Sequence, residues 1–102
     1  DTKDRQLHKI IYSLISAPNY QSGKIQNLTA TTDGIMFIMD TGLPDNCKDT
    51  PYGWMLIKQE HTAIISTVLA AWASDNKSGT AYTSGRSGGT GYCIVNQFNP
   101  VN

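Results

Sequence analysis

The stretch YGWMLIKQEHTAIISTVLAAWAS, residues 52–74, decides the fold because it joins a predicted strand to the clearest predicted helix of the chain. Residues 52–58 are rich in β-forming side chains and predict the strand. Residues 60–74 predict the helix, since apolar side chains recur there at helical spacing and leave mostly small polar ones opposite. The apolar stripe consists of Ile64, Ile65, Val68, Leu69 and Trp72. The strands before and after this pair then determine the architecture.

Two strands are predicted before this pair and two after it. Residues 24–31 and 35–39 form the first two, joined at Asp33-Gly34, a dipeptide that favours a tight hairpin turn. The run at 35–39 is apolar throughout, so we expect both of its faces to be covered. Beyond the helix, residues 80–83 and 92–98 predict the fourth and fifth strands, with a glycine-rich loop between them.

The architecture follows from this order of elements. Residues 1–16 predict a leading helix, which Pro18 ends. A helix between the third and fourth of five strands is the order of an OB-fold, a small Greek-key barrel. We therefore expect a mainly β protein with helices, of the α+β class, as one domain over residues 1–102 with the barrel at 22–98. A plain α+β sheet with two helices packed on it is the competing architecture.

The balance of charge bears on the partners. Eight basic and eight acidic residues cancel to a formal net charge of zero. A nucleic-acid binder usually carries a basic excess, because neutralising phosphates supplies most of its affinity, so DNA and RNA are not expected partners. No apolar run is long enough to span a membrane, and we expect no membrane insertion. The start at Asp1 suggests a mature form whose signal peptide has been removed.

Two cysteines, Cys47 and Cys93, indicate the compartment. Their spacing matches no metal site, and neither a metal nor a cofactor is expected. A disulfide between them would stabilise so small a core by about 4 kcal/mol through the lost entropy of the unfolded chain. We predict this disulfide, and with it secretion through the periplasm to the outside of the cell. Two free buried thiols in a cytosolic protein are the alternative.

Catalytic motifs are weak in this chain. His8 and His61 fall on the two predicted helices, and nothing in the spacing brings them together as an acid–base pair. A surface or capping role is the simpler interpretation of each histidine. We therefore expect a protein that is not an enzyme.

The turn Tyr20-Gln21-Ser22-Gly23-Lys24-Ile25 is the best candidate for binding, because it presents a hydroxyl just before a predicted strand. A carboxylate binds well to a hydroxyl together with backbone N–H groups at a turn, and a nearby cation strengthens the contact. Tyr20 and Tyr52 flank connecting segments and are the expected exposed aromatic side chains, whereas Trp54 and Trp72 are expected in the core.

This turn resembles an element of the B subunits of pertussis-like and subtilase-type bacterial toxins. The hairpin into Ile35-Met36-Phe37-Ile38 and the Thr50-Pro51 pair before the third strand are similar as well. Proteins of that family are pentameric OB-folds that bind sialylated host glycans and carry a separate catalytic A subunit.

The resemblance implies a site and an assembly. Ser22 would hold the carboxylate of a sialic acid, with Gln21 beside it. The chemistry of such a site, and not a family motif, adds the other residues. Tyr20 would lie against the apolar face of the sugar, Thr50 would reach its hydroxyl groups, and Lys48 or Arg86 would supply the positive charge. A homopentamer would place the 60–74 helix around a central pore that receives the A subunit.

Three functions follow, in order of preference. The first is a secreted toxin B subunit that binds sialylated cell-surface glycans as a pentamer and delivers a catalytic A subunit. The second is a periplasmic inhibitor or immunity-type protein that binds a single protein partner. The third is a small secreted hydrolase or nuclease that uses His8 or His61.

Overall fold

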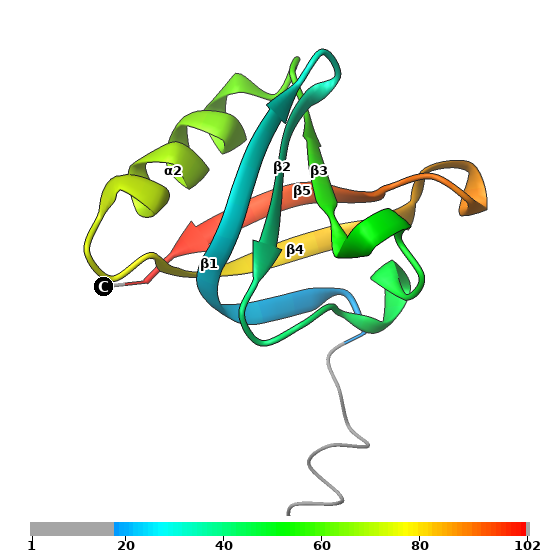
Figure 1. Ribbon diagram of the computed structural model, residues 1–102, viewed down its shortest axis with the longest axis horizontal. Coiled ribbons are helices and arrows are strands. Elements are labelled where there is room, and N and C mark those ends of the chain that lie inside the picture. The colour runs from blue at the N-terminus through cyan, green and yellow to red at the C-terminus, as the bar shows by residue number, and fades with distance from the viewer. Residues whose placement is uncertain (1–17, 102) are drawn as a thin grey trace, which may run out of the picture.

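The computed structural model describes residues 18–101, which contain five strands and one α-helix (Figure 1). The leading helix predicted at 1–16 lies outside these residues. The strands and the helix are β1 (Tyr20–Thr31), β2 (Gly34–Met39), β3 (Met55–Lys58), α2 (Thr62–Ala73), β4 (Ser78–Arg86) and β5 (Cys93–Pro100). Short 3-10 turns lie at Asp45–Cys47, Pro51–Gly53 and Ser87–Gly89. The predicted order of strands and helix between residues 24 and 98 is confirmed.

The five strands form a closed barrel in the order β1-β2-β3-β5-β4. Neighbouring strands are antiparallel except β3 and β5, which are parallel. Closure depends on β1, which bends so that its first half pairs with β4 and its second half with β2 (Figure 1). A register shift between Ile25 and Asn27 marks the bend, as a bulge does when a strand changes partner.

Two strands begin three or more residues away from the predicted position. β1 starts at Tyr20, so Ser22 lies inside a strand and not in the turn that we expected before it. The reason is long-range, since residues 20–24 pair with β4 and gain a sheet partner that local sequence cannot reveal. β3 starts only at Met55, because Pro51–Gly53 forms a 3-10 turn in which Tyr52 takes a left-handed φ of 55°.

The core lies inside the barrel and is closed at one end by α2. Alternate residues of each strand point inward, and the rings of Phe37 and Phe98 meet edge to face with centroids 5.8 Å apart. From α2, Val68 and Ala71 are buried against the strands, and Trp72 packs beside them. Leu69, predicted on the buried stripe, is 42% exposed, which corrects that part of the prediction. Both faces of β2 are largely covered, as its apolar sequence predicts.

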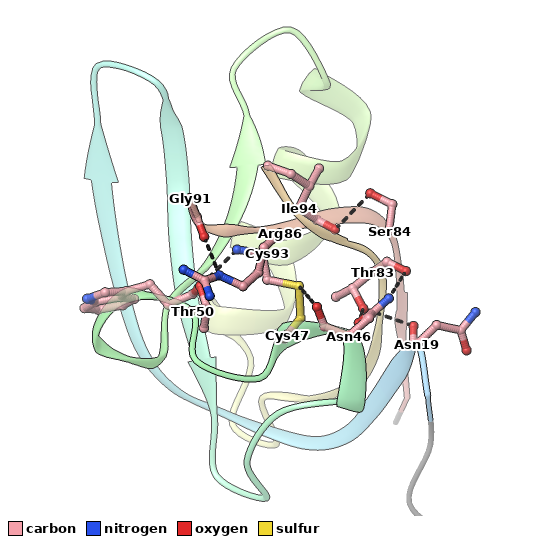
Figure 2. Close-up of a disulfide and its surroundings, with 11 residues drawn as sticks. Asn19, Asn46, Cys47, Thr50, Thr83, Ser84, Arg86, Gly91, Cys93 and Ile94 are labelled. Atoms are coloured by element: carbon pink, nitrogen blue, oxygen red, sulfur yellow. Dashed lines mark hydrogen bonds between the residues drawn. A yellow bond between two sulfur atoms is a disulfide. The ribbon is translucent and has the colours of Figure 1, made fainter. Parts of the chain in front are cut away.

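A disulfide joins Cys47 to Cys93, as predicted, with both residues buried and their Cα atoms 5.1 Å apart (Figure 2). It ties the loop after β2 to the first residue of β5. Asn46 adds polar links from the same loop to β4, since its side chain exchanges hydrogen bonds with Thr83. A disulfide is compatible with a secreted or periplasmic protein. Among residues 18–101, no helix is long and apolar enough to cross a membrane.

Candidate functional site

Ser22 lies on the outer face of the barrel, where β1 pairs with β4. Side chains alternate along β1, so Tyr20, Ser22 and Lys24 share the face opposite the buried Ile25. Ser22 is directly opposite Thr80 in the register, and the two hydroxyl oxygens are hydrogen-bonded at 2.8 Å. Ser22 is exposed and Thr80 is half-buried, so this hydroxyl pair faces solvent.

Two tyrosines lie next to the hydroxyl pair. Tyr20 is opposite Tyr82 in the same ladder. On the outer face, this pair is next to the pair of Ser22 and Thr80. The ring centroids are 5.8 Å apart at an interplanar angle of 37°, and Tyr20 is 42% exposed. A pair of adjacent rings at the surface offers an apolar face beside polar donors, which is the combination that binds sugars.

A hollow of about 500 Å³ adjoins Ser22 on the side away from the tyrosines. Its walls include Lys24 and Thr80 from the paired strands and Asp40 and Thr41 from the loop after β2. The hollow therefore presents one ammonium, one carboxylate and several hydroxyl groups. We call it the Ser22 hollow.

Hydrogen bonds hold the loop after β2 against β1. Thr41 Oγ1 donates to the carbonyl oxygen of Ser22 at 2.6 Å and accepts from Gln21 Nε2 at 2.6 Å. Asp40 Oδ1 accepts from the backbone N–H of Lys24 at 2.8 Å. A Cβ on Gly23 would lie 2.6 Å from both Asp40 Oδ1 and Thr41 Oγ1, so a larger residue at this position would displace these two side chains. The wall of the Ser22 hollow is thus built before any ligand arrives.

Thr50 does not join this site. It is 5% exposed, and its hydroxyl donates to the carbonyl oxygen of Trp54 at 2.7 Å and accepts from the N–H of Cys93 at 2.9 Å (Figure 2). Both bonds serve to anchor the loop that carries Cys47. Thr50 therefore has a structural position beside the disulfide, and its hydroxyl is already engaged.

Arg86 and Lys48 are also placed elsewhere. Arg86 is six residues beyond Thr80 on β4, on the order of 20 Å at the rise of a strand. Its guanidinium donates from Nε to the carbonyl oxygen of Gly91 at 2.9 Å (Figure 2). Nη2 donates to the carbonyl oxygen of Thr90 at 2.6 Å, and the two bonds close the β4–β5 loop. Lys48 is exposed at the end of the 3-10 turn that contains Cys47. The cation beside Ser22 is Lys24.

The residues that the sequence reasoning missed are Lys24, Asp40, Thr41, Thr80 and Tyr82. Alternation along a strand could have found Lys24, since it is two residues from Ser22. Thr80 and Tyr82 carry no local signal, because they join the site only through the register of β1 against β4.

The described residues do not place His61 in a catalytic arrangement. His61 Nε2 lies 3.8 Å from Glu60 Oε1, and both side chains are exposed. His8 lies outside the described residues. Within residues 18–101, no three His, Cys, Asp or Glu side chains come together as metal ligands would.

Comparisons with protein-family models, with curated proteins and with solved structures give no match.

Proposed function

We propose that this protein is a secreted, non-enzymatic glycan-binding subunit with an OB-fold, of the kind that delivers the catalytic subunit of a pertussis-like or subtilase-type toxin. The strand order β1-β2-β3-β5-β4, with α2 between β3 and β4, supports the OB-fold assignment. The ligand is a glycan that ends in sialic acid, and its carboxylate binds at Ser22.

The observation that carries this proposal is the hydrogen bond between Ser22 and Thr80. Each hydroxyl has one proton, and the bond between them uses one of the two, so the other can be donated to a carboxylate oxygen. A hydroxyl that already accepts a hydrogen bond is a stronger donor, because the two bonds polarise each other. The ammonium of Lys24, on the same face of β1, adds a charge-assisted contact.

The remaining groups suit the rest of the sugar. Tyr20 and Tyr82 lie on one side of Ser22 and can cover the apolar face of a pyranose ring. Asp40, on the other side, can accept hydrogen bonds from sugar hydroxyl groups. Asp40 would also repel a second carboxylate, so the site favours one acidic group placed at Ser22 and Lys24.

Pentamer formation is part of the proposal, because a shallow single site binds weakly and five copies on a ring raise the avidity. The exposed face of α2 carries small side chains that permit close packing of helices around a pore, including Ala63, Ser66 and Ala70. Light scattering tests this directly, since a pentamer has five times the 11.1 kDa of one chain.

The decisive experiment compares a sialylated glycan array with the same glycans after removal of sialic acid. We expect binding only to the sialylated glycans and its loss in Ser22→Ala. Ser84→Ala is the matched control, because Ser84 is an exposed serine of β4 outside the site. Equal binding of wild type and Ser22→Ala would refute the site, and binding to neither array would refute the function.

Tyr52 favours a second candidate, an inhibitor or immunity-type protein with one protein partner. It is 88% exposed and is held at φ 55° between Pro51 and Gly53, so the loop presents an aromatic side chain to solvent at the cost of backbone strain. A monomer that ignores glycans but forms a complex with a periplasmic enzyme, lost in Tyr52→Ala, would establish this candidate.

A further inference from the structure

Two buried apolar side chains lie on the outside of the barrel. Met36 and Leu56 are 7% and 8% exposed, yet the residues that flank Leu56, Met55 and Ile57, point into the core. By alternation Leu56 points away from the core, and neither it nor Met36 belongs to the core cluster. The register aligns them with Ile94, so an apolar row crosses the outer faces of β2, β3 and β5.

This row leads into a hollow of about 510 Å³, which we call the β3–β5 hollow. It opens where the parallel ladder between β3 and β5 ends, at the pair Leu56 and Ile94. Tyr92 extends the apolar lining, and the remaining wall comes from the β1–β2 turn, the end of β3 and the β4–β5 loop. A volume of this size is within the range of about 300–1,000 Å³ seen for ligand sites.

Main-chain hydrogen bonds hold the walls in place. The N–H of Gln59 donates to the carbonyl oxygen of Asp33 at 2.9 Å, which ties the end of β3 to the β1–β2 turn. On the other wall, the N–H of Ser87 donates to the carbonyl oxygen of Tyr92 at 3.0 Å. Arg86 closes the same loop through its guanidinium. The β3–β5 hollow is therefore preformed, which lowers the cost of ordering it around a ligand.

Charge on the rim selects the ligand. Among the residues that line the hollow, the two carboxylates of Asp33 and Glu60 outnumber the one ammonium, that of Lys58, and all three side chains are exposed. His61 lies beside Glu60, with Nε2 3.8 Å from Oε1. Arg86 is a further cation behind the β4–β5 loop, and its guanidinium is engaged by the carbonyl oxygens of Gly91 and Thr90. The excess of carboxylates therefore concerns the side chains that line the hollow. Together with the apolar floor, this lining matches an apolar group that carries a positive charge next to it and disfavours an acidic one.

We propose that the β3–β5 hollow binds a peptide segment of a partner protein in which an apolar side chain is followed by lysine or arginine. The apolar side chain covers Leu56 and Ile94, and the cation meets Asp33 and Glu60. This site goes beyond the glycan site and does not depend on it, since the β3–β5 hollow shares no lining residue with the Ser22 hollow.

The test is an amide-resolved NMR titration with blocked dipeptides. N-acetyl-Leu-Arg-amide should shift the amide signals of Leu56, Gly91 and Ile94 and leave those of Ser22 and Thr80 in place. N-acetyl-Gly-Arg-amide lacks the apolar side chain, so its affinity should be lower by about tenfold or more. N-acetyl-Leu-Glu-amide should also bind more weakly, and added salt should reduce this difference.

Charge variants complete the test without disturbing the apolar floor. Asp33→Asn and Glu60→Gln should each weaken Leu-Arg binding about two- to fivefold, as expected for an exposed ion pair. Asp75→Asn, at an exposed carboxylate after α2, should change nothing. Equal affinity for Leu-Arg and Leu-Glu would overturn the proposal, and so would shifts outside the hollow. Signal changes at the hollow that depend on protein concentration alone would assign it to a second copy of this chain, and shifts there with sialyllactose would assign it to sugar.

Discussion

The hydroxyl oxygens of Ser22 and Thr80 lie 2.8 Å apart across the paired strands β1 and β4, although the two residues are 58 positions apart in the chain. This contact exists only because the bent strand β1 closes the barrel against β4. It also couples the two side chains, so the loss of either one changes the donor that the other presents.

Because the two hydroxyl groups are coupled, we predict that the losses of glycan-binding free energy in Ser22→Ala and Thr80→Val are not additive. Each should weaken binding of a sialylated glycan about tenfold or more, since a hydrogen bond to a charged group is lost or weakened. The double variant should be little worse than Ser22→Ala, because both changes disrupt one unit. Calorimetry on the four proteins measures this, and fully additive losses would show that the hydroxyl groups act separately.

We predict that the ring of Tyr20, and not its hydroxyl group, contributes to glycan binding. Tyr20→Ala removes a 42% exposed ring beside Tyr82 and should weaken glycan binding about fivefold to tenfold, whereas Tyr20→Phe keeps the stacking surface and should bind nearly as wild type. Tryptophan fluorescence and glycan titration together separate binding from folding. A loss in Tyr20→Phe equal to that in Tyr20→Ala would contradict a stacking role.

Thr50 predicts a loss of stability without a loss of glycan affinity. Thr50→Val leaves the N–H of Cys93 and the carbonyl of Trp54 without their partner, and should lower the free energy of unfolding by about 1–3 kcal/mol. Thr50→Ser keeps the hydroxyl and is the control. Urea unfolding gives the stability change. If the folded Thr50→Val protein bound glycan much more weakly, Thr50 would belong to the site after all.

We predict that replacing Gly34 lowers stability, because both its φ and the lack of space for a Cβ disfavour a larger residue. Its φ is 146°, and an added Cβ would overlap the carbonyl oxygen of Ile57 on the neighbouring strand. Gly34→Ala should lower the free energy of unfolding by about 2 kcal/mol or more and the melting temperature by about 10 °C. At Gly42, with φ 105°, an added Cβ would meet no atom within 4 Å, so Gly42→Ala should cost clearly less. Equal melting temperatures for the two variants would contradict this account.

The disulfide predicts a large difference between the oxidised and reduced proteins. Cys47 and Cys93 are 46 positions apart, and the lost entropy of the unfolded chain corresponds to about 4 kcal/mol. Reduction, or the double variant Cys47→Ala/Cys93→Ala, should shift urea unfolding accordingly. An unchanged unfolding curve after complete reduction would show that the loop after β2 is held by its hydrogen bonds alone.

Most of the described fold could be predicted from local patterns. The apolar run at 35–39 correctly indicated a covered strand, and the helical spacing in residues 60–74 indicated α2. The predicted hairpin is present, but its turn is Thr32-Asp33 and not Asp33-Gly34, because Gly34 already pairs with Thr31 as the first residue of β2. The errors occurred where distant strands intervene. β1 extends back to Tyr20 because β4 is available to pair with it. Leu69 is exposed because the orientation of α2 on the barrel buries Val68 and Ala71 instead.

The candidate site divides in the same way. Ser22 and Tyr20 were predicted, because a hydroxyl and an aromatic side chain near the start of a strand are visible in the sequence. Thr50 and Arg86 were predicted in the same site. In the structure both side chains form hydrogen bonds to backbone carbonyl groups near the disulfide instead. Lys24 supplies the cation, and Thr80 and Tyr82 complete the surface.

The sequence by itself determined the order of the strands and the helix and the partners in the disulfide, because apolar periodicity, turn residues and a single cysteine pair act over short distances or leave one choice. Only the tertiary structure decided which side chains share a surface. That choice depends on the register between strands, and a shift of one residue would turn Ser22 from the outer face of the barrel to the inner one. The register is set by the closed barrel as a whole, so the pairing of Ser22 with Thr80 has no counterpart in any short stretch of the chain.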